Sequence, residues 1–188
     1  DALARGQDNP GVRAELERAG LDTRHITQVD GSGLSYENRV SPRSLVATLR
    51  IGATSFRYGP ELLAALPIAA ADGTLEKRAE ASANQVRAKT GLLTRVTSLS
   101  GLAQGRDGRV LIFSVLVNGF RGDAENADRL RVSHDGVCNR VLRRKLDRAC
   151  NRDAFIERPL AHRNGIAHAQ VAVCERPRLV EDDIARSR

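Results

Sequence analysis

The chain has no methionine and no tryptophan, and only 3% of its 188 residues are aromatic. A hydrophobic core must therefore be built from Leu, Val, Ile and Ala, which the apolar content of 41% supplies. No apolar run approaches the ~20 residues that cross a bilayer, so no transmembrane segment is predicted. The charged-then-apolar pattern of a secretory signal is also missing. Because there is no initiating methionine either, we expect a piece of a longer protein.

Basic residues are concentrated in one part of the chain. The net charge is +7, and residues 129–188 hold 14 Lys and Arg against 8 Asp and Glu, a net of +6 that leaves +1 elsewhere. All three cysteines and three of the four histidines lie there too. This change in composition predicts a boundary between residues 1–128 and a basic tail over 129–188. A reading-frame slip in the gene is one hypothesis for it.

The cysteines and histidines of the tail do not have the spacing of a metal site. Eleven, eleven, five and five residues separate Cys138, Cys150, His162, His168 and Cys174. Zinc sites usually contain close pairs such as Cys-x₂₋₄-Cys. The sequence therefore predicts no metal site, and no motif in it indicates another cofactor.

Helix signals dominate the first eighty residues. Pro10 and Gly20 bracket a short helix, and Ser41-Pro42 is typical of a helix start, with serine as the cap and proline in the first position. Further helices are expected over 59–66 and 75–83.

Three strands are expected next: one that contains Lys89, one over 96–103 and one over 110–117. The third is apolar on both faces, which is typical of a central strand covered on both sides. Helices followed by an antiparallel meander predict an α+β fold, a sheet with helices packed on it. In the tail, an amphipathic helix is expected over 137–149, and no sustained period follows Asn151.

The first of these strands carries the candidate chemistry. Apolar and basic residues alternate up to Lys89-Thr90-Gly91. A lysine ammonium supplies charge for an anion, a threonine hydroxyl supplies a directional hydrogen bond, and glycine lets a ligand backbone lie close. Lys-Thr-Gly at the end of a strand therefore predicts an anion site at a sheet edge.

Four ordered blocks resemble one family of penicillin-binding enzymes. They are residues 30–42 (Asp-Gly-Ser-Gly-Leu-Ser-Tyr-Glu-Asn-Arg-Val-Ser-Pro), 66–69 (Leu-Pro-Ile-Ala) with 72–75 (Asp-Gly-Thr-Leu), 86–91 (Val-Arg-Ala-Lys-Thr-Gly) and 115–119 (Val-Leu-Val-Asn-Gly). Together they resemble the D-alanyl-D-alanine carboxypeptidase/endopeptidases of the class C, low-molecular-mass penicillin-binding proteins. The resemblance covers about residues 10–128 and implies part of the serine β-lactamase/penicillin-binding-protein (transpeptidase-like) fold.

The family performs acyl transfer from an active-site serine with three motifs, Ser-x-x-Lys, Ser-x-Asn and Lys-Thr-Gly. The resemblance implies that Lys89 attracts the terminal carboxylate of D-Ala-D-Ala and favours proton transfer. Thr90 would hydrogen-bond that carboxylate, and Gly91 would leave room for substrate to pair with the strand edge. The backbone N–H of Leu92 would be one oxyanion donor.

In the loop, the resemblance implies that Ser35 shuttles a proton toward the leaving group and that Asn38 holds the substrate amide. Capping of a turn is the alternative role for Asn38. Residues 72–74 are expected to form a structural turn that borders the site.

The sequence departs from the family pattern in four places. No Ser-x-x-Lys occurs in it, so the nucleophile is expected upstream of this chain. Ser-x-Asn spacing would require asparagine where Glu37 stands, one position before Asn38. Leu92 replaces the usual Thr or Ser, and Arg95 stands where a small residue is usual.

The implied function is that of a serine-type D-Ala-D-Ala carboxypeptidase, with endopeptidase activity left open, outside the cytoplasmic membrane or in the periplasm. Its partners would be peptidoglycan stem peptides that end in D-Ala-D-Ala, with β-lactams as inhibitors. This chain alone is expected to be inactive. One alternative is a non-catalytic truncated remnant, in which the strand over 110–117 would lack a neighbour. The other is a basic protein that binds nucleic acid or another anion, which the single aromatic residue of the tail, Phe155, disfavours.

Overall fold

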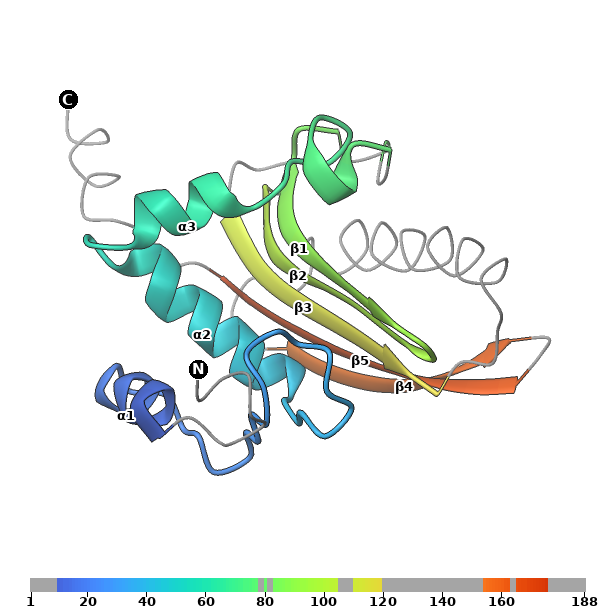
Figure 1. Cartoon of the computed structure of the whole chain (residues 1–188). Coiled ribbons are helices and arrows are strands. Elements are labelled where there is room, and N and C mark those ends of the chain that lie inside the picture. Colours follow the sequence, from blue (N-terminus) through green and yellow to red (C-terminus); the bar gives the residue numbers. More distant parts are fainter. Residues whose placement is uncertain are drawn as a thin grey trace.

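The computed structural model describes residues 10–77, 80, 83–104, 110–119, 154–162 and 165–175. Its elements, in chain order, are α1 (Pro10–Arg18), α2 (Pro42–Thr54), α3 (Gly59–Ala65), the 3₁₀ turn η2 (Gly73–Leu75), β1 (Val86–Leu93), β2 (Val96–Gln104), β3 (Val110–Asn118), β4 (Ala154–His162) and β5 (Gly165–Glu175). The five strands form one antiparallel sheet in the order β1-β2-β3-β5-β4 (Figure 1). The α+β class predicted from the sequence is confirmed.

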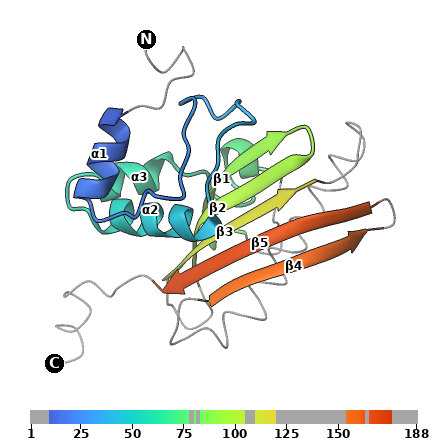
Figure 2. The ribbon, with the colours of Figure 1, turned by 90° about the horizontal axis from the view of Figure 1, so that it is seen from below.

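Helix α2 covers one face of the sheet and packs against β3, β5 and β2, while α3 packs on α2 (Figure 2). The helix starts where the sequence predicted. Ser41 accepts a hydrogen bond from the backbone N–H of Ser44 (3.0 Å), and Pro42 occupies the first turn. A hydrophobic cluster joins the helices to the sheet; its buried members are Val46, Ala53, Leu66, Leu102 and Ile112.

The first helix also follows its prediction. Helix α1 ends before Gly20, which has a φ of +87°. The N–H of Gly20 bonds to the carbonyl of Glu17 (2.9 Å), and that of Leu21 bonds to the carbonyl of Leu16 (2.9 Å). This paired capping by a left-handed glycine ends many helices.

Strand β3 is the central strand of the sheet, and its side chains are buried on both faces. Phe113, Val115 and Ile112 are each at most 1% exposed. The prediction of a central strand covered on both sides is confirmed. Its second neighbour is β5, whose residues 168–175 pair with β3. The expectation that this strand would lack a neighbour is therefore wrong, because a hairpin from the tail supplies one. The sequence pattern after Asn151 predicts no strand there.

The α-helix expected over 75–83 is also wrong for the described part of that segment. Only η2 and isolated turns form there, because the chain must reverse at once to enter β1. The N–H of Asn84 bonds to the carbonyl of Ala69 (3.0 Å), and the N–H of Ala69 bonds to the carbonyl of Val86 (2.9 Å). The helix predicted over 137–149 lies outside the described residues.

Candidate binding site at the edge of β1

The side chains of β1 alternate between the two faces of the sheet. Arg87 donates to the carbonyl of Leu63 in α3 (3.1 Å), so Arg87 lies on the face that the helices cover. Since side chains in a strand alternate with a period of two, Lys89 and Gly91 share that face. Thr90 lies on the other face, where its hydroxyl meets the hydroxyl of Thr74 (3.0 Å).

Lys89 holds a charge that is not neutralised within the described part of the chain. Its side chain is exposed, and Nζ donates to the carbonyl of Thr90 (2.6 Å). None of the ion pairs among the described residues includes this lysine. Its ammonium group is therefore available to an anion at this edge.

Half of the outer edge of β1 is paired and half is open. The N–H of Ala88 bonds to the carbonyl of Pro67 (3.0 Å), and the carbonyl of Val86 accepts from Ala69, so the segment 67–69 closes the first half. Backbone groups in a strand also alternate in direction, so those of Thr90 and Leu92 point to the same outer side. Within the described residues, the N–H groups of Thr90 and Leu92 meet no partner there. This open stretch can accept an added strand.

The missing Cβ of Gly91 makes room for a neighbouring hydroxyl. A Cβ at this position would lie 2.4 Å from Oγ of Ser98 on β2. Ser100, two residues on, lies opposite Lys89 and hydrogen-bonds the hydroxyl of Ser114 on β3 (2.8 Å). The sequence predicts that the space at Gly91 is left for substrate, whereas the structure fills it with the first of three serines. Two serines spaced by two residues in β2, Ser98 and Ser100, are the signal that could have revealed part of this group.

The loop before α2 is closed at its base and braced at its centre. Backbone hydrogen bonds between Thr27 and Arg39 close it (2.9 and 2.8 Å). Inside it, the carboxylate of Asp30 accepts from the hydroxyl of Ser32 (2.5 Å) and the side-chain amide of Asn38 (2.7 Å). These hydrogen bonds, with smaller ones from backbone N–H groups, hold the pKa of Asp30 below its ordinary value.

The two loop residues predicted to act on substrate differ in what their side chains already contact. Both polar atoms of Asn38 are used inside the loop. Its Nδ2 donates to Asp30, and its Oδ1 accepts from the N–H groups of Val29 (2.8 Å) and Asp30 (3.3 Å). The hydroxyl of Ser35 accepts from the N–H of Glu37 (3.1 Å), and its own proton has no acceptor among the described residues.

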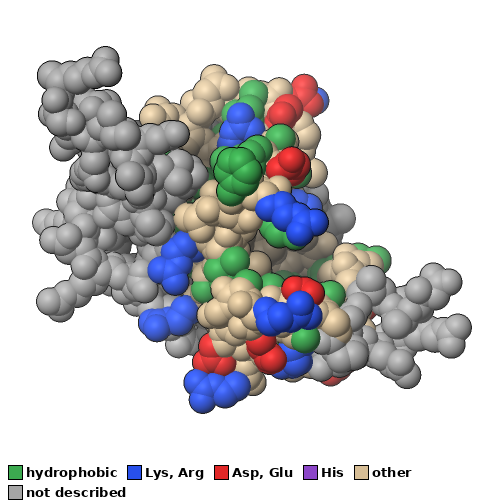
Figure 3. All heavy atoms as spheres, turned by 90° about the vertical axis from the view of Figure 1, so that its left-hand side faces the viewer, with side chains coloured by type: hydrophobic (Ala, Val, Ile, Leu, Met, Phe, Trp, Pro, Cys, Tyr) green, Lys and Arg blue, Asp and Glu red, His purple; other side chains and the backbone are tan. Residues whose placement is uncertain are grey.

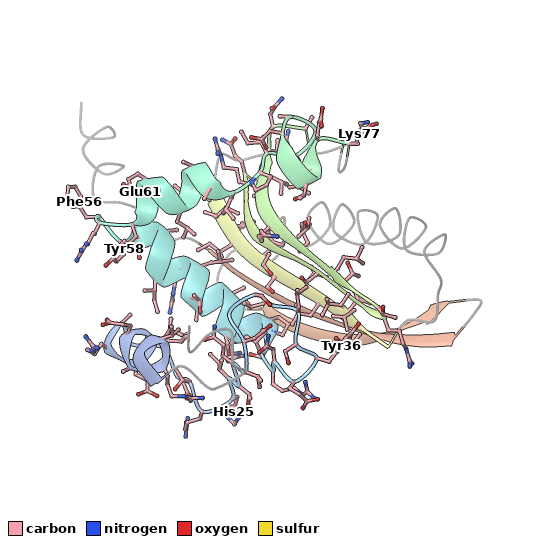
Figure 4. All side chains as sticks on the ribbon, in the orientation of Figure 1. His25, Tyr36, Phe56, Tyr58, Glu61 and Lys77 are labelled. Carbon is pink, nitrogen blue, oxygen red and sulfur yellow. The ribbon has the colours of Figure 1, made fainter. Side chains whose placement is uncertain are left out.

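The loop and β1 lie on the same side of the molecule. The view from below shows the loop on the β1–β2 side of the sheet and far from β4 (Figure 2). Tyr36 marks the loop, whereas Phe56 and Tyr58 lie at the opposite end of α2 (Figure 4). No hydrogen bond or ion pair joins the loop to Lys89 within the described part of the chain.

Two turns border the edge. Residues 72–74 form a structural turn, as expected: the carboxylate of Asp72 accepts from the N–H of Ile68, and Thr74 contacts Thr90. At the β1–β2 turn, Arg95 has a φ of +65°. This conformation favours glycine, which agrees with the expectation of a small residue there.

The sequence profile of the D-Ala-D-Ala carboxypeptidase 3 (S13) family matches residues 4–140, almost three quarters of the chain. The chain belongs to this family. Carboxypeptidase Rv3627c of Mycobacterium tuberculosis is 40% identical over 128 residues, which are 62% of this chain and 27% of that protein. The D-alanyl-D-alanine carboxypeptidase of Actinomadura sp. strain R39 is 37% identical over 121 residues, 61% of this chain and 22% of that protein.

Solved structures of the S13 family agree with the fold. Penicillin binding protein 4 (dacB) of Haemophilus influenzae, complexed with a β-lactam, superposes with a TM-score of 0.61 and 28% identity over 70% of this chain. That match uses 32% of the Haemophilus chain. This chain thus spans about a quarter of the length of the curated relatives it matches. The family profile ends before β4 and β5, the two strands of the tail.

Neither a metal cluster nor a membrane-spanning helix occurs among the described residues. No group of three or more His, Cys, Asp or Glu side chains there is arranged to hold a metal ion. No helix in the same residues is long and apolar enough to cross a bilayer.

Proposed function

We propose that this chain forms one wall of the substrate site of a serine-type D-Ala-D-Ala carboxypeptidase that acts on peptidoglycan stem peptides and binds β-lactams. The observation that carries the proposal is the open half-edge of β1. There, among the described residues, Lys89 has no ion-pair partner and the N–H groups of Thr90 and Leu92 have no acceptor. Membership in the S13 family and the likeness to a β-lactam complex support it. Whether the whole protein also acts as an endopeptidase stays open.

In this proposal the substrate adds to β1 as a further strand. Lys89 attracts the terminal carboxylate. The hydroxyl of Thr90, which donates to Thr74 in the free chain, turns its proton to that carboxylate from the other face. The N–H of Leu92 donates to the developing oxyanion, a role that needs only a backbone group. Ser35, whose proton is free, transfers a proton toward the leaving group.

The acylating serine and its lysine are not in this sequence, since no Ser-x-x-Lys occurs in it. We therefore propose that catalysis needs residues from outside the chain and that this chain alone forms no acyl-enzyme. Because the family works on the cell wall, we place the protein outside the cytoplasmic membrane or in the periplasm. We also propose residues 1–128 as the peptidase part and 129–188 as an added tail whose origin in a frame slip remains a hypothesis.

The test uses the chain with ¹⁵N labels and a tripeptide that ends in D-Ala-D-Ala. The amide signals of residues 89–93 are expected to shift on titration, and a peptide ending in L-Ala-L-Ala is expected to leave them in place. The variant Lys89→Gln should bind ~10- to 150-fold more weakly, because a hydrogen bond to a charged group contributes about 1.5–3 kcal/mol. Lys77→Gln, which removes the same charge from the exposed turn after η2 (Figure 4), is the control.

Two results would contradict the proposal. The first is a D-Ala-D-Ala peptide that shifts no amide of β1. The second is a fluorescent penicillin that labels the chain covalently, because the chain lacks the serine motif that acylation requires.

The basic alternative has little support from the described surface. On the helical side of the molecule, acidic, basic and hydrophobic side chains are interspersed rather than grouped by charge (Figure 3). A nucleic-acid site needs a basic patch or stripe. The described part of that face does not provide one.

A further inference from the structure

Asp30 receives four hydrogen bonds within the loop, all from residues 32–38. Its Oδ2 accepts from the hydroxyl of Ser32 and the N–H of Ser35 (2.5 and 3.2 Å), and its Oδ1 accepts from the N–H of Gly33 and the amide of Asn38 (3.2 and 2.7 Å). Two of these donors are backbone groups, and the others come from side chains. The carboxylate therefore connects both ends of the loop through a single group.

Asn38 completes the connection from the other end. Its Oδ1 returns to the N–H groups of Val29 and Asp30, so the two side chains form a reciprocal pair that we name the Asp30–Asn38 clamp. The amide oxygen and one N–H of Asn38 are used in this way, which leaves a single N–H of the amide for any other partner. The role of Asn38 is thereby separated from that of Ser35, whose hydroxyl proton stays unused.

We propose that Asp30 is a positioning residue, and that the Asp30–Asn38 clamp fixes the backbone of Ser35 so that its hydroxyl is presented to a substrate on β1. The proposal deepens the function proposed above and rests on it for the role of Ser35. Its structural part stands on the hydrogen bonds alone. Asp30 itself touches no substrate in this scheme and acts only through Ser35.

The clamp acts independently of the base of the loop. The backbone bridge between Thr27 and Arg39 closes the loop without any side chain. Loss of the Asp30 carboxylate would therefore free Ser35 and Gly33 while the loop stays anchored and α2 keeps its serine cap. The expected defect is a local one rather than unfolding of the domain.

The full set of four hydrogen bonds needs the ionised carboxylate of Asp30, because all four partners donate. Hydrogen bonds from Ser32 and Asn38 lower the pKa of Asp30 from its ordinary value of 3.8. The stabilisation by the clamp is thus complete above the unfolded pKa and is lost as the pH falls through the lower folded pKa. The other charged groups of the loop are Glu37 and Arg39, which pair with each other.

The experiment compares four variants of the chain: Asp30→Asn, Asn38→Asp, the double exchange, and the control Asp22→Asn. Asp22 is an exposed carboxylate that bonds only to Arg24 among the described residues. Amide exchange at Ser35 and Gly33 is expected to be about tenfold faster in each single variant of the clamp, the factor for loss of roughly one hydrogen bond. It should be unchanged in the control.

The double variant Asp30→Asn/Asn38→Asp again places a donor opposite an acceptor. Amide hydrogen exchange at Ser35 should therefore return to its slow rate. If the two side chains acted independently, the effects of the two substitutions on the exchange rate would add, and the double variant would show no recovery. In the unmodified chain, the Ser35 amide signal should titrate with an apparent pKa below 3.8, and this titration should vanish in Asp30→Asn. Additive single effects, or a Ser35 signal that does not follow Asp30, would overturn the clamp.

Titration with the D-Ala-D-Ala tripeptide separates this proposal from the proposed function. If the unmodified chain binds the peptide while Asp30→Asn loses the shifts at Ser35 and keeps those over 89–93, the positioning role is supported. If Asp30→Asn keeps all of them, the positioning role is wrong while the binding site stands. If no variant binds the peptide, the proposed function fails, and the exchange data still decide the clamp.

Discussion

Gly91→Ala is a sharp test of the packing beneath Lys89. The added Cβ would lie 2.4 Å from Oγ of Ser98, which is shorter than any ordinary contact between a Cβ and another heavy atom. Its distance to Cβ of the same serine would be 3.7 Å, an ordinary van der Waals contact. Gly91 does not have a positive φ, so the backbone accepts alanine. The conflict therefore concerns one hydroxyl, which must leave its present rotamer.

The magnitude follows from these two distances. Forcing Ser98 out of its rotamer and overpacking the site should destabilise the chain by about 1–2 kcal/mol. In a Ser98→Ala background the hydroxyl is absent and the 3.7 Å contact remains. The same Gly91→Ala change should then stabilise by about 0.5 kcal/mol, because alanine in a strand loses less backbone entropy than glycine. The sign of the effect is expected to reverse.

Urea denaturation of the four proteins of this cycle measures both effects, with thermal melting as a second probe. For a chain of this size, 1–2 kcal/mol corresponds to a fall in Tm of about 2–8 °C. An equal loss of stability from Gly91→Ala in both backgrounds would refute the reasoning, because the hydroxyl of Ser98 could not then be the obstacle.

Three further changes probe the sheet and its turns. Gly101→Ala would bring a Cβ to 2.1 Å from a backbone oxygen of β1, so a loss of about 3 kcal/mol or more is expected in urea denaturation; a tolerated variant would contradict the β1–β2 register. Ala70→Gly should raise the free energy of unfolding by about 0.5 kcal/mol, because Ala70 has a φ of +56°, which favours glycine. Ala71→Gly should lower it by a similar amount in the same thermal melts. Effects of the same sign from both substitutions would contradict the left-handed conformation of Ala70. Ser114→Ala should cost about 1 kcal/mol by leaving the hydroxyl of Ser100 unpaired, and the double alanine variant should cost less; a double variant that is worse than the single would argue against the hydrogen bond.

Patterns within short segments predicted α1, α2, α3 and the β1–β2–β3 meander well. Ser41-Pro42 marked the start of α2 because capping is decided by adjacent residues. The doubly apolar run of β3 indicated a central strand because burial on both faces leaves no polar positions. In contrast, the chain after η2 does not form the predicted helix in its described residues, since pairing of 67–69 with β1 overrides local helix preference.

The place of the candidate site at a sheet edge could be predicted in part for the same reason. Lys89, Thr90 and the open edge followed from a contiguous strand. The serines of β2 and the clamp of Asp30 depend on which side chains meet across strands or across a loop, and no single-segment pattern encodes that. For Asn38, both alternatives were considered, and its contacts favour the capping role.

The position of β5 beside β3 has a consequence during synthesis. Strands β1, β2 and β3 can pair as soon as Asn118 has left the ribosome, whereas the last residue of β5, Glu175, is made 57 residues later. At ribosomal rates of ~5–20 residues per second, the apolar margin of β3 would wait roughly 3–11 s for its partner. During that interval the nascent chain has an unpaired apolar strand edge that can pair with other chains. Slow translation or a shortage of chaperones is therefore expected to lower the yield of folded protein through aggregation.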